Sequence, residues 1–196
     1  MYSQFGEDDF IGGYFKGRVG RFLDIGAWQP KTISNTRRLF ELGWDGVLVE
    51  PSPEPLSQLV TEYGKTPSRV SVVGCAISTK TEFVRFWDAG KVGLSTMIES
   101  FTKQWVEKHK VVYQNFWVSS VTMDDFVRAF PGPYHFVSID AEGISASIFL
   151  SYDWSKTSTE MVVIEHDDRI PEILTHAAKF GMKEKLRTFA NVVVAK

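Results

Sequence analysis

Acidic side chains gather at the ends of the short apolar runs that the sequence predicts to be buried β-strands. The acids and the one histidine at these ends are Asp24, Glu50, Asp140, Glu142, Glu165, His166, Asp167 and Asp168. A carboxylate placed there can accept hydrogen bonds from sugar hydroxyls, attract a cationic ligand or remove a proton from a reacting group. Helix capping accounts well for Asp167 or Asp168. It accounts less well for Asp24 and Asp140, which lie within apolar runs, so we expect a functional cluster.

Apolar runs alternate with segments of helical periodicity along the chain, which is the pattern of an α/β fold. The predicted strands span residues 21–25, 46–50, 70–77, 82–87, 115–121, 134–140 and 161–166, with a terminal hairpin of 182–187 and 191–195. The predicted helices span residues 32–42, 54–63, 98–110, 123–130 and 171–180. Because the strands are rich in valine and isoleucine without alternation, we expect a doubly wound parallel sheet buried on both faces. Ligands of such sheets bind beyond the carboxyl ends of the strands.

The composition indicates one domain spanning residues 1–196, with no linker. The 22 Lys and Arg residues nearly balance the 24 Asp and Glu residues, so no basic surface for nucleic acid is expected. No apolar stretch has the length of roughly 18 residues that a membrane-spanning helix needs. Cys75 is the only cysteine, which excludes a disulfide framework and a thiolate zinc site, and we expect it to be a buried structural thiol. One cysteine and an N-terminus without signal-peptide features predict a cytoplasmic protein.

The turn after the first predicted strand distinguishes two classes of ligand. A dinucleotide-binding fold has Gly-x-Gly-x-x-Gly there, so that bare backbone can approach the pyrophosphate. This chain has Gly26, Trp28 and Pro30, and Asp24 stands just before the glycine. An acid at this position disfavours a phosphate and favours a cation. S-adenosylmethionine carries an ammonium and a sulfonium group and no phosphate, whereas Glu50 suits the ribose of either ligand and does not discriminate between them.

Six short motifs occur in a fixed order along the chain. They are Ser3-Gln-Phe-Gly-Glu-Asp8, Phe22-Leu-Asp-Ile-Gly-Ala27, Ser34-Asn-Thr36, Gly43-Trp-Asp-Gly46, Glu50-Pro-Ser-Pro53 and Ser138-Ile-Asp-Ala-Glu-Gly143. The ordered set resembles the FkbM family of methyltransferases, with Ala141 as a small departure, because that family commonly has valine there. The resemblance implies a Rossmann-like class I methyltransferase fold with a seven-stranded sheet and a reversed C-terminal strand. It also implies S-adenosyl-L-methionine as the methyl donor and, usually, a hydroxyl oxygen as the acceptor.

The resemblance also implies roles for individual residues. The expected cofactor-binding residues are Gln4, Asp24, Gly26, Ala27, Asn35, Glu50, Pro51, Ala76, Ile77 and Asp140. Asp24 and Gly26 are expected to hold the methionine end of the cofactor, and Glu50 its ribose. Ala76 and Ile77 are expected to line the adenine slot, with plain packing at a strand end as the alternative.

A hydroxyl acceptor benefits from a base that takes its proton. The candidates are Asp140, Glu142 and His166, although Asp140 has an alternative role as partner of the cofactor ammonium group. A divalent cation between Asp140 and the acids of the fifth parallel strand is the less favoured hypothesis, because no ligand set is specified. We therefore predict no metal site.

Two segments lie outside the predicted core. Residues 1–15 contain the N-terminal motif and are expected to form a lid over the site, or else Ser3 simply caps a helix. Residues 88–118 form an insert rich in aromatic side chains, which we expect to recognise a small-molecule or glycan acceptor; a covered sheet edge or a dimer contact is the alternative. The expected function is an S-adenosylmethionine-dependent O-methyltransferase. An NAD(P)-dependent oxidoreductase, a nucleotide-sugar enzyme and a non-catalytic binding module remain as alternatives.

Overall fold

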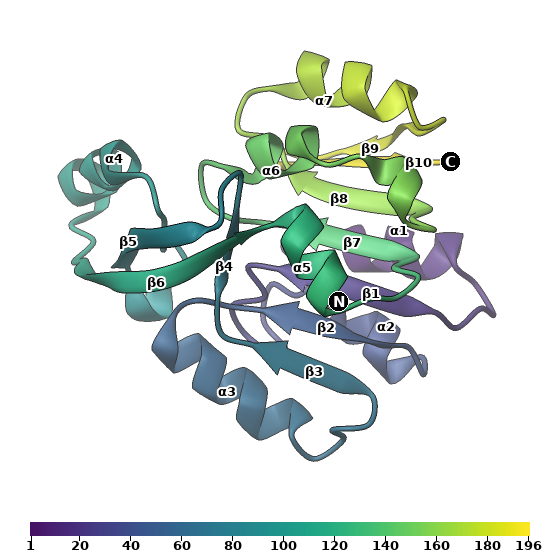
Figure 1. Ribbon diagram of the computed structural model, residues 1–196, viewed down its shortest axis with the longest axis horizontal. Helices are drawn as coiled ribbons and strands as arrows, with labels where there is room; N and C mark the ends of the chain where they lie inside the picture. The colour runs from purple at the N-terminus through teal and green to yellow at the C-terminus, as the bar shows by residue number, and fades with distance from the viewer.

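The computed structural model describes residues 1–196 and contains two β-sheets (Figure 1). The large sheet consists of β1 (Arg21–Ile25), β2 (Asp45–Val49), β3 (Val70–Val73), β7 (Phe136–Ile139), β8 (Met161–Glu165), β9 (Lys183–Arg187) and β10 (Asn191–Ala195). Its strand order is β3-β2-β1-β7-β8-β10-β9. Neighbouring strands from β3 to β8 are parallel, whereas β10 is antiparallel to both β8 and β9. The predicted mostly parallel seven-stranded sheet with a reversed C-terminal strand is confirmed.

Helices cover both faces of the large sheet (Figure 1). One face carries α1 (Glu7–Tyr14), α2 (Arg37–Glu41) and α3 (Pro53–Tyr63), and the other carries α5 (Met123–Ala129), α6 (Ser145–Ser151) and α7 (Ile170–Ala178). Successive side chains of a strand point to opposite faces, so β1 contributes Phe22 to the first core and Leu23 and Ile25 to the second. This two-sided burial explains why the strands lack polar alternation, and it gives the doubly wound, Rossmann-like arrangement.

A smaller sheet projects beyond the carboxyl ends of the parallel strands (Figure 1). It consists of β4 (Ala76–Ser78), β5 (Glu82–Asp88) and β6 (Gln114–Thr122), in the order β4-β6-β5. The 3-10 turn η1 (Gly90–Val92) and α4 (Glu99–His109) lie between β5 and β6, and a second such turn, η2 (Trp154–Lys156), precedes β8. The longest helices, α3 and α4, have 11 residues each, and none is long and apolar enough to cross a membrane.

Three elements differ from the sequence-based expectations. Residues 70–77 form two strands rather than one, because Gly74 and Cys75 carry the chain from the large sheet into the small one. The helix expected over residues 32–42 begins only at Arg37, because Ile33 has a left-handed backbone with a φ of +52°, and Asn35 therefore precedes the helix. The sequence does not predict α6, whose seven residues include three serines and no charged side chain to mark its faces.

Candidate functional site

The main pocket opens between the carboxyl ends of β1, β2 and β7 and the small sheet. Its empty volume is about 940 Å³, a value that includes the open solvent at its mouth. The predicted site residues that line it are Gln4, Gly26, Glu50, Pro51, Ala76, Ile77, Asp140 and Glu142. The predicted site residues that do not line it are Asp24, Ala27, Asn35 and His166. The structure thus brings together residues from both sheets and from the N-terminal segment.

Gly26 lets the loops after β1 and β7 approach each other closely. Its backbone is left-handed, with a φ of +75°, and a Cβ atom placed on it would lie 1.7 Å from the carbonyl oxygen of Asp140. The Gly26 amide donates to Val49, and the Asp140 amide donates to Ile25. The three strand ends therefore form one hydrogen-bonded floor that only a glycine at position 26 permits.

Glu50 is held rigidly at the floor of the pocket. Its side chain is 4% exposed, and its two carboxylate oxygens accept hydrogen bonds from the amides of Trp28 at 2.9 Å and Ser52 at 2.7 Å. Burial raises the pKa of the Glu50 carboxyl to about 7, although these two amide donors lower it in part. Each oxygen keeps a free lone pair, so Glu50 can still accept two hydrogen bonds from a ligand.

Three carboxyl groups meet beside the floor of the pocket. Asp140 and Glu142 follow β7, Glu165 ends β8, and one oxygen of each lies within 4.8 Å of the others. Burial, and then the charges of Asp24 and Asp167, raise the pKa of Asp140 to about 6. Burial and the Asp140 charge raise the pKa values of Glu142 and Glu165 well above their ordinary range. So close a cluster shares protons or attracts a cation, and its oxygens are of the type that could hold a divalent ion.

These shifts predict a stability that falls as the pH rises. Glu50 and Asp24 have pKa values of about 7 and about 6 in the folded chain, above those of an unfolded chain. Each therefore contributes stability that is fully present below its unfolded pKa and is lost as the pH rises through its folded pKa. Between pH 5 and pH 8 we expect these two groups to lower the unfolding free energy of the ligand-free protein by about 4 kcal/mol, measured by urea titration. Glu50→Gln should flatten this slope, and stability that rises over the same range would contradict the assignment.

Asp24 and Asn35 lie behind the pocket rather than on its surface. The Asp24 carboxylate is 4% exposed and accepts a hydrogen bond from the Thr36 hydroxyl at 2.5 Å. Burial raises the pKa of Asp24 to about 6, although the Thr36 and Ser138 hydroxyls lower it in part. Asn35 donates to the Ser138 hydroxyl at 3.1 Å. These contacts position the end of β1, and a direct contact of Asp24 with a ligand stays a prediction.

The structure does not bring His166 to the pocket. Its Nδ1 accepts a hydrogen bond from the Asp168 amide at 3.1 Å, so its Nε2 is left to donate to the Phe189 carbonyl at 2.9 Å. Both ring nitrogens therefore have partners outside the pocket. Asp167 accepts from the Ala146 amide at 2.8 Å and so caps α6 rather than the helix that follows it. Ala27 is 5% exposed and packs in the core beside α1, α2 and α3.

The pocket also contains residues that sequence reasoning missed. Trp28 and Ile33 line it with left-handed backbones, at φ values of +46° and +52°, and the predicted Glu142 shares this conformation at +41°. Non-glycine residues in this conformation cost about 1–2 kcal/mol each and concentrate at functional sites. Cys75 is half-buried and lines the pocket, rather than lying fully in the core, and burial raises the pKa of its thiol to about 11. Trp28 could have been predicted from the sequence, because a bulky tryptophan directly after Gly26-Ala27 is unusual in a turn at a strand end. No feature of the sequence indicates that Ile33 lines the pocket.

The N-terminal motif folds into a fixed turn that brings Gln4 to the pocket. The Ser3 hydroxyl donates to the Asp8 carboxylate and accepts from the Asp8 amide in the first turn of α1, although the residue at the N-cap position is Gly6 rather than Ser3. Glu7 is fully buried and accepts from the side-chain amide of Asn191 in β10 at 2.8 Å. Gly6 links the two halves of the turn with a φ of +86°. Movement of this segment as a lid stays a prediction.

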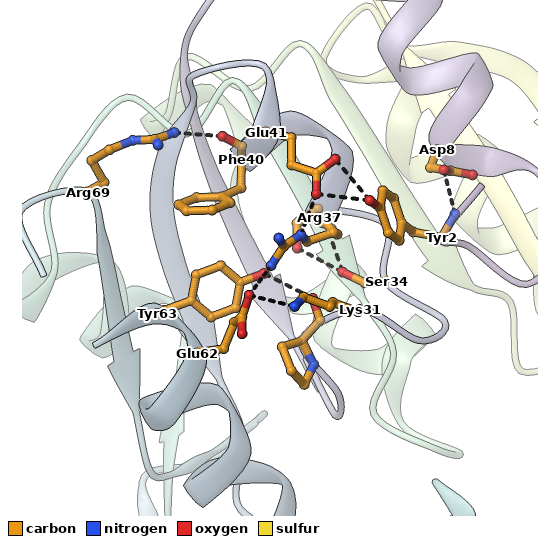
Figure 2. A network of polar contacts seen from close by, with 12 residues as sticks. Tyr2, Asp8, Lys31, Ser34, Arg37, Phe40, Glu41, Glu62, Tyr63 and Arg69 are labelled. Atoms are coloured by element: carbon orange, nitrogen blue, oxygen red, sulfur yellow. Dashed lines mark hydrogen bonds and ion pairs between the residues drawn. The ribbon is translucent and has the colours of Figure 1, made fainter. Parts of the chain in front are cut away.

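A polar network fastens the first residues to α2 and α3 (Figure 2). The Tyr2 amide donates to Asp8, and the Tyr2 hydroxyl donates to Glu41. Figure 2 shows that Arg37 lies at the centre of this network, where it donates to Glu41 at 2.9 Å and to Glu62 at 2.8 Å. One arginine therefore connects the N-terminal segment with both helices.

Arg37→Met is expected to lower the unfolding free energy by about 2 kcal/mol, because the Arg37 side chain is only 10% exposed and its two ion pairs are partly shielded from water. Urea unfolding measures the change. The control is Arg38→Met, since the Arg38 side chain is 40% exposed and pairs with an exposed Asp9. That control should change stability by less than about 1 kcal/mol. Equal losses for the two variants would contradict the structural role of Arg37.

The charged residues that line the pocket favour a cationic ligand over one that carries phosphate groups. Its charged lining residues are Glu50, Asp140 and Glu142, and no lysine, arginine or histidine lines it. Sites for pyrophosphate groups use bare backbone amides or cationic side chains. A lining of three acids, with apolar walls that include Ile77 and Phe86, instead suits a ligand with a cationic end and a flat apolar end. No model of a known protein family matches the chain, and no curated protein matches it.

Proposed function

We propose that this protein is an S-adenosyl-L-methionine-dependent methyltransferase that methylates a hydroxyl oxygen of a small molecule or glycan. The observation that carries the proposal is a pocket at the carboxyl ends of the strands whose charged lining residues are all acids. The resemblance of the six ordered motifs to the FkbM family supports the same reading. The alternatives, an NAD(P)-dependent oxidoreductase or a nucleotide-sugar enzyme, bind phosphate through bare backbone amides or cationic side chains, and this lining offers three acids and no cationic side chain.

Each end of the cofactor has a matching part of the pocket. Glu50 accepts hydrogen bonds from the two ribose hydroxyls, because both of its oxygens are fixed and each keeps a free lone pair. Cys75, Ala76 and Ile77 form an apolar slot for the adenine ring. Asp140 faces the ammonium group of the methionine end. The backbone at Gly26 allows close approach, since a side chain there would collide with the loop after β7.

Glu142 is the base in this proposal. Glu142 lines the pocket, and its carboxylate makes no hydrogen bond within the chain. Its left-handed backbone is held in place by the Thr96 hydroxyl, which donates to the Glu142 carbonyl at 2.7 Å. When bound, the cofactor supplies a methyl group already activated by its sulfonium. The protein then has to hold the acceptor hydroxyl in line and accept its proton on the Glu142 carboxylate. The raised pKa of Glu142 makes it a stronger base than an exposed carboxylate.

The acceptor is proposed to enter over residues 92–97, which line the pocket on the side of the small sheet and lead into α4. Val92, Leu94 and Met97 line the pocket, and Phe101 of α4 lies against Gly143 of the loop that carries Glu142. This lining is apolar and carries no positive charge, so it suits a neutral acceptor better than a phosphorylated one. We place the activity in the cytoplasm, in keeping with a single unpaired thiol.

Transfer of a labelled methyl group tests the proposal. The protein is incubated with methyl-labelled cofactor and a metabolite or glycan extract, and mass spectrometry identifies which molecules gain the label. Glu142→Gln is expected to reduce turnover about 100-fold while cofactor binding is kept, because it removes the base and preserves the shape of the side chain. Glu172→Gln in α7 is the control and should leave turnover unchanged, because the Glu172 side chain is 56% exposed and does not line the pocket. Cofactor binding without labelling of any acceptor would favour the non-catalytic binding module.

A further inference from the structure

The outer edge of β5 is free to pair with another strand. Within an antiparallel ladder, alternate residues direct their amide and carbonyl groups to opposite sides of the strand. Trp87 directs both groups away from β6, because they bond to Thr96 at 2.8 and 2.9 Å. By the same alternation, Arg85 and Phe83 also direct their backbone groups outward, and neither forms a backbone hydrogen bond outside the β5–β6 ladder. Four backbone hydrogen-bonding groups therefore face solvent along this edge.

The β9 edge of the large sheet is protected against pairing with a further strand, whereas the β5 edge of the small sheet is less so. The edge strand β9 has four charged residues among five, and the pairing of β10 with β9 is broken by an irregularity at Val193 and Val194. Charges and bulges of this kind prevent unwanted strand pairing. The β5 strand has no proline, no lysine and an unbroken register of seven residue pairs with β6. Only three of its seven residues are charged, and the segment 83–85 has free outward backbone groups, so it can serve as a pairing site.

Aromatic and cationic side chains alternate on the outer face of the same strands. Phe83 is 72% exposed and Trp117 is 63% exposed. Arg85 lies directly opposite Trp117 in the ladder, and its guanidinium carbon is 5.6 Å from the centre of a Trp117 ring. One side of Arg85 is thus covered by an aromatic ring, and its other side faces the free edge.

We propose that β5 pairs antiparallel with β5 of a second copy of this chain, about a two-fold axis that passes beside Val84. In this register Phe83 of each copy lies opposite Arg85 of the other, and their outward backbone groups form four hydrogen bonds. Pairing ends at Trp87, whose groups already bond to Thr96. Each Arg85 then lies between Trp117 of its own chain and Phe83 of the second copy, which is a favourable cation–π arrangement. A register centred on Arg85 would instead place two like charges opposite each other.

The pairing would also support the pocket. Phe86 alternates with Arg85 along β5, so its side chain points to the inner face, where it is 4% exposed and lines the pocket. The two small sheets would become one continuous six-stranded sheet behind the two pockets.

Sedimentation velocity of the full chain over a range of micromolar concentrations tests the dimer. The wild-type protein is expected to dimerise, and Phe83→Lys should weaken the dimer at least about tenfold, because it places lysine opposite Arg85 twice per dimer. Phe189→Lys is the matched control, since Phe189 is 88% exposed on the distant β9–β10 turn, and it should leave the dimer unchanged. The double variant Phe83→Lys with Arg85→Glu should restore the dimer, because each lysine then faces a glutamate.

The restored dimer distinguishes this register from any other surface, and circular dichroism verifies that each variant is folded. A wild-type protein that stays monomeric throughout the range would overturn the proposal. So would a dimer that Phe83→Lys does not weaken, or one that the double variant fails to restore. An extended peptide that binds β5 of a monomeric wild-type protein would identify a different occupant and would likewise overturn it.

Discussion

Glu50→Ala is expected to weaken the binding of S-adenosylhomocysteine, the demethylated product of the cofactor, about 1,000-fold. The substitution removes both acceptors for the ribose hydroxyls, and hydrogen bonds to a charged group contribute about 1.5–3 kcal/mol each. Glu50 is placed for this role because two amides fix its oxygens at the floor of the pocket. Isothermal titration calorimetry measures the change in affinity.

A matched variant separates this effect from a general loss of negative charge. Glu54→Ala removes a carboxylate four residues further along, where the Glu54 side chain is 45% exposed and does not line the pocket. The Glu54→Ala variant should bind S-adenosylhomocysteine with the same affinity as the wild type. Because Glu50→Ala also leaves the amides of Trp28 and Ser52 without partners, binding is measured well below the midpoint of thermal unfolding. Equal affinity for Glu50→Ala and the wild type would contradict the ribose assignment.

Gly26→Ala is expected to destabilise the protein by about 4 kcal/mol or more, or to prevent folding. The new methyl group would lie 1.7 Å from the Asp140 carbonyl oxygen, so the loops after β1 and β7 would have to separate. Chemical denaturation measures the loss.

Gly17→Ala is the control for the backbone conformation alone. Gly17 has a similar φ of +72°, but no heavy atom lies within 4 Å of the added carbon. It should cost only about 1–2 kcal/mol, the ordinary penalty of a left-handed alanine. If the two alanine variants lose equal stability, the close approach of the two strand-end loops is not what requires Gly26.

The carboxylates of the pocket explain why a ligand should affect stability. Near neutral pH the buried Glu50 and the Asp140–Glu142–Glu165 cluster either hold protons or repel one another, and both states cost free energy. A cationic ligand removes part of that cost. The stabilisation that it confers should therefore increase with pH over the range in which the protein without ligand becomes less stable.

Sequence reasoning predicted the parallel strands because their burial on both faces leaves continuous runs of valine and isoleucine. It joined residues 70–77 into one strand, since an apolar run contains no sign of which sheet it enters. It placed Glu50, Asp140 and Glu142 correctly at one edge, because the carboxyl ends of parallel strands must meet there.

Other parts of the site depend on contacts between distant segments and could not be predicted. Asp24 precedes Ile25, the last residue of β1, and the alternation of side chains along the strand directs Asp24 toward Thr36 and away from the pocket. His166 is held away from the pocket by its hydrogen bond to the Phe189 carbonyl in the β9–β10 turn, some 20 residues further along the chain. Ile33 and residues from 92–97 line the pocket beside the strand ends although they lie in separate loops of the chain.

Calorimetric titration of the wild-type protein with S-adenosylhomocysteine and, separately, with NADH tests the central claim most directly. The acidic pocket predicts that the first ligand binds at one site per chain and that the second, which carries a pyrophosphate, does not bind. Tight binding of NADH together with no binding of S-adenosylhomocysteine or S-adenosylmethionine would contradict the account.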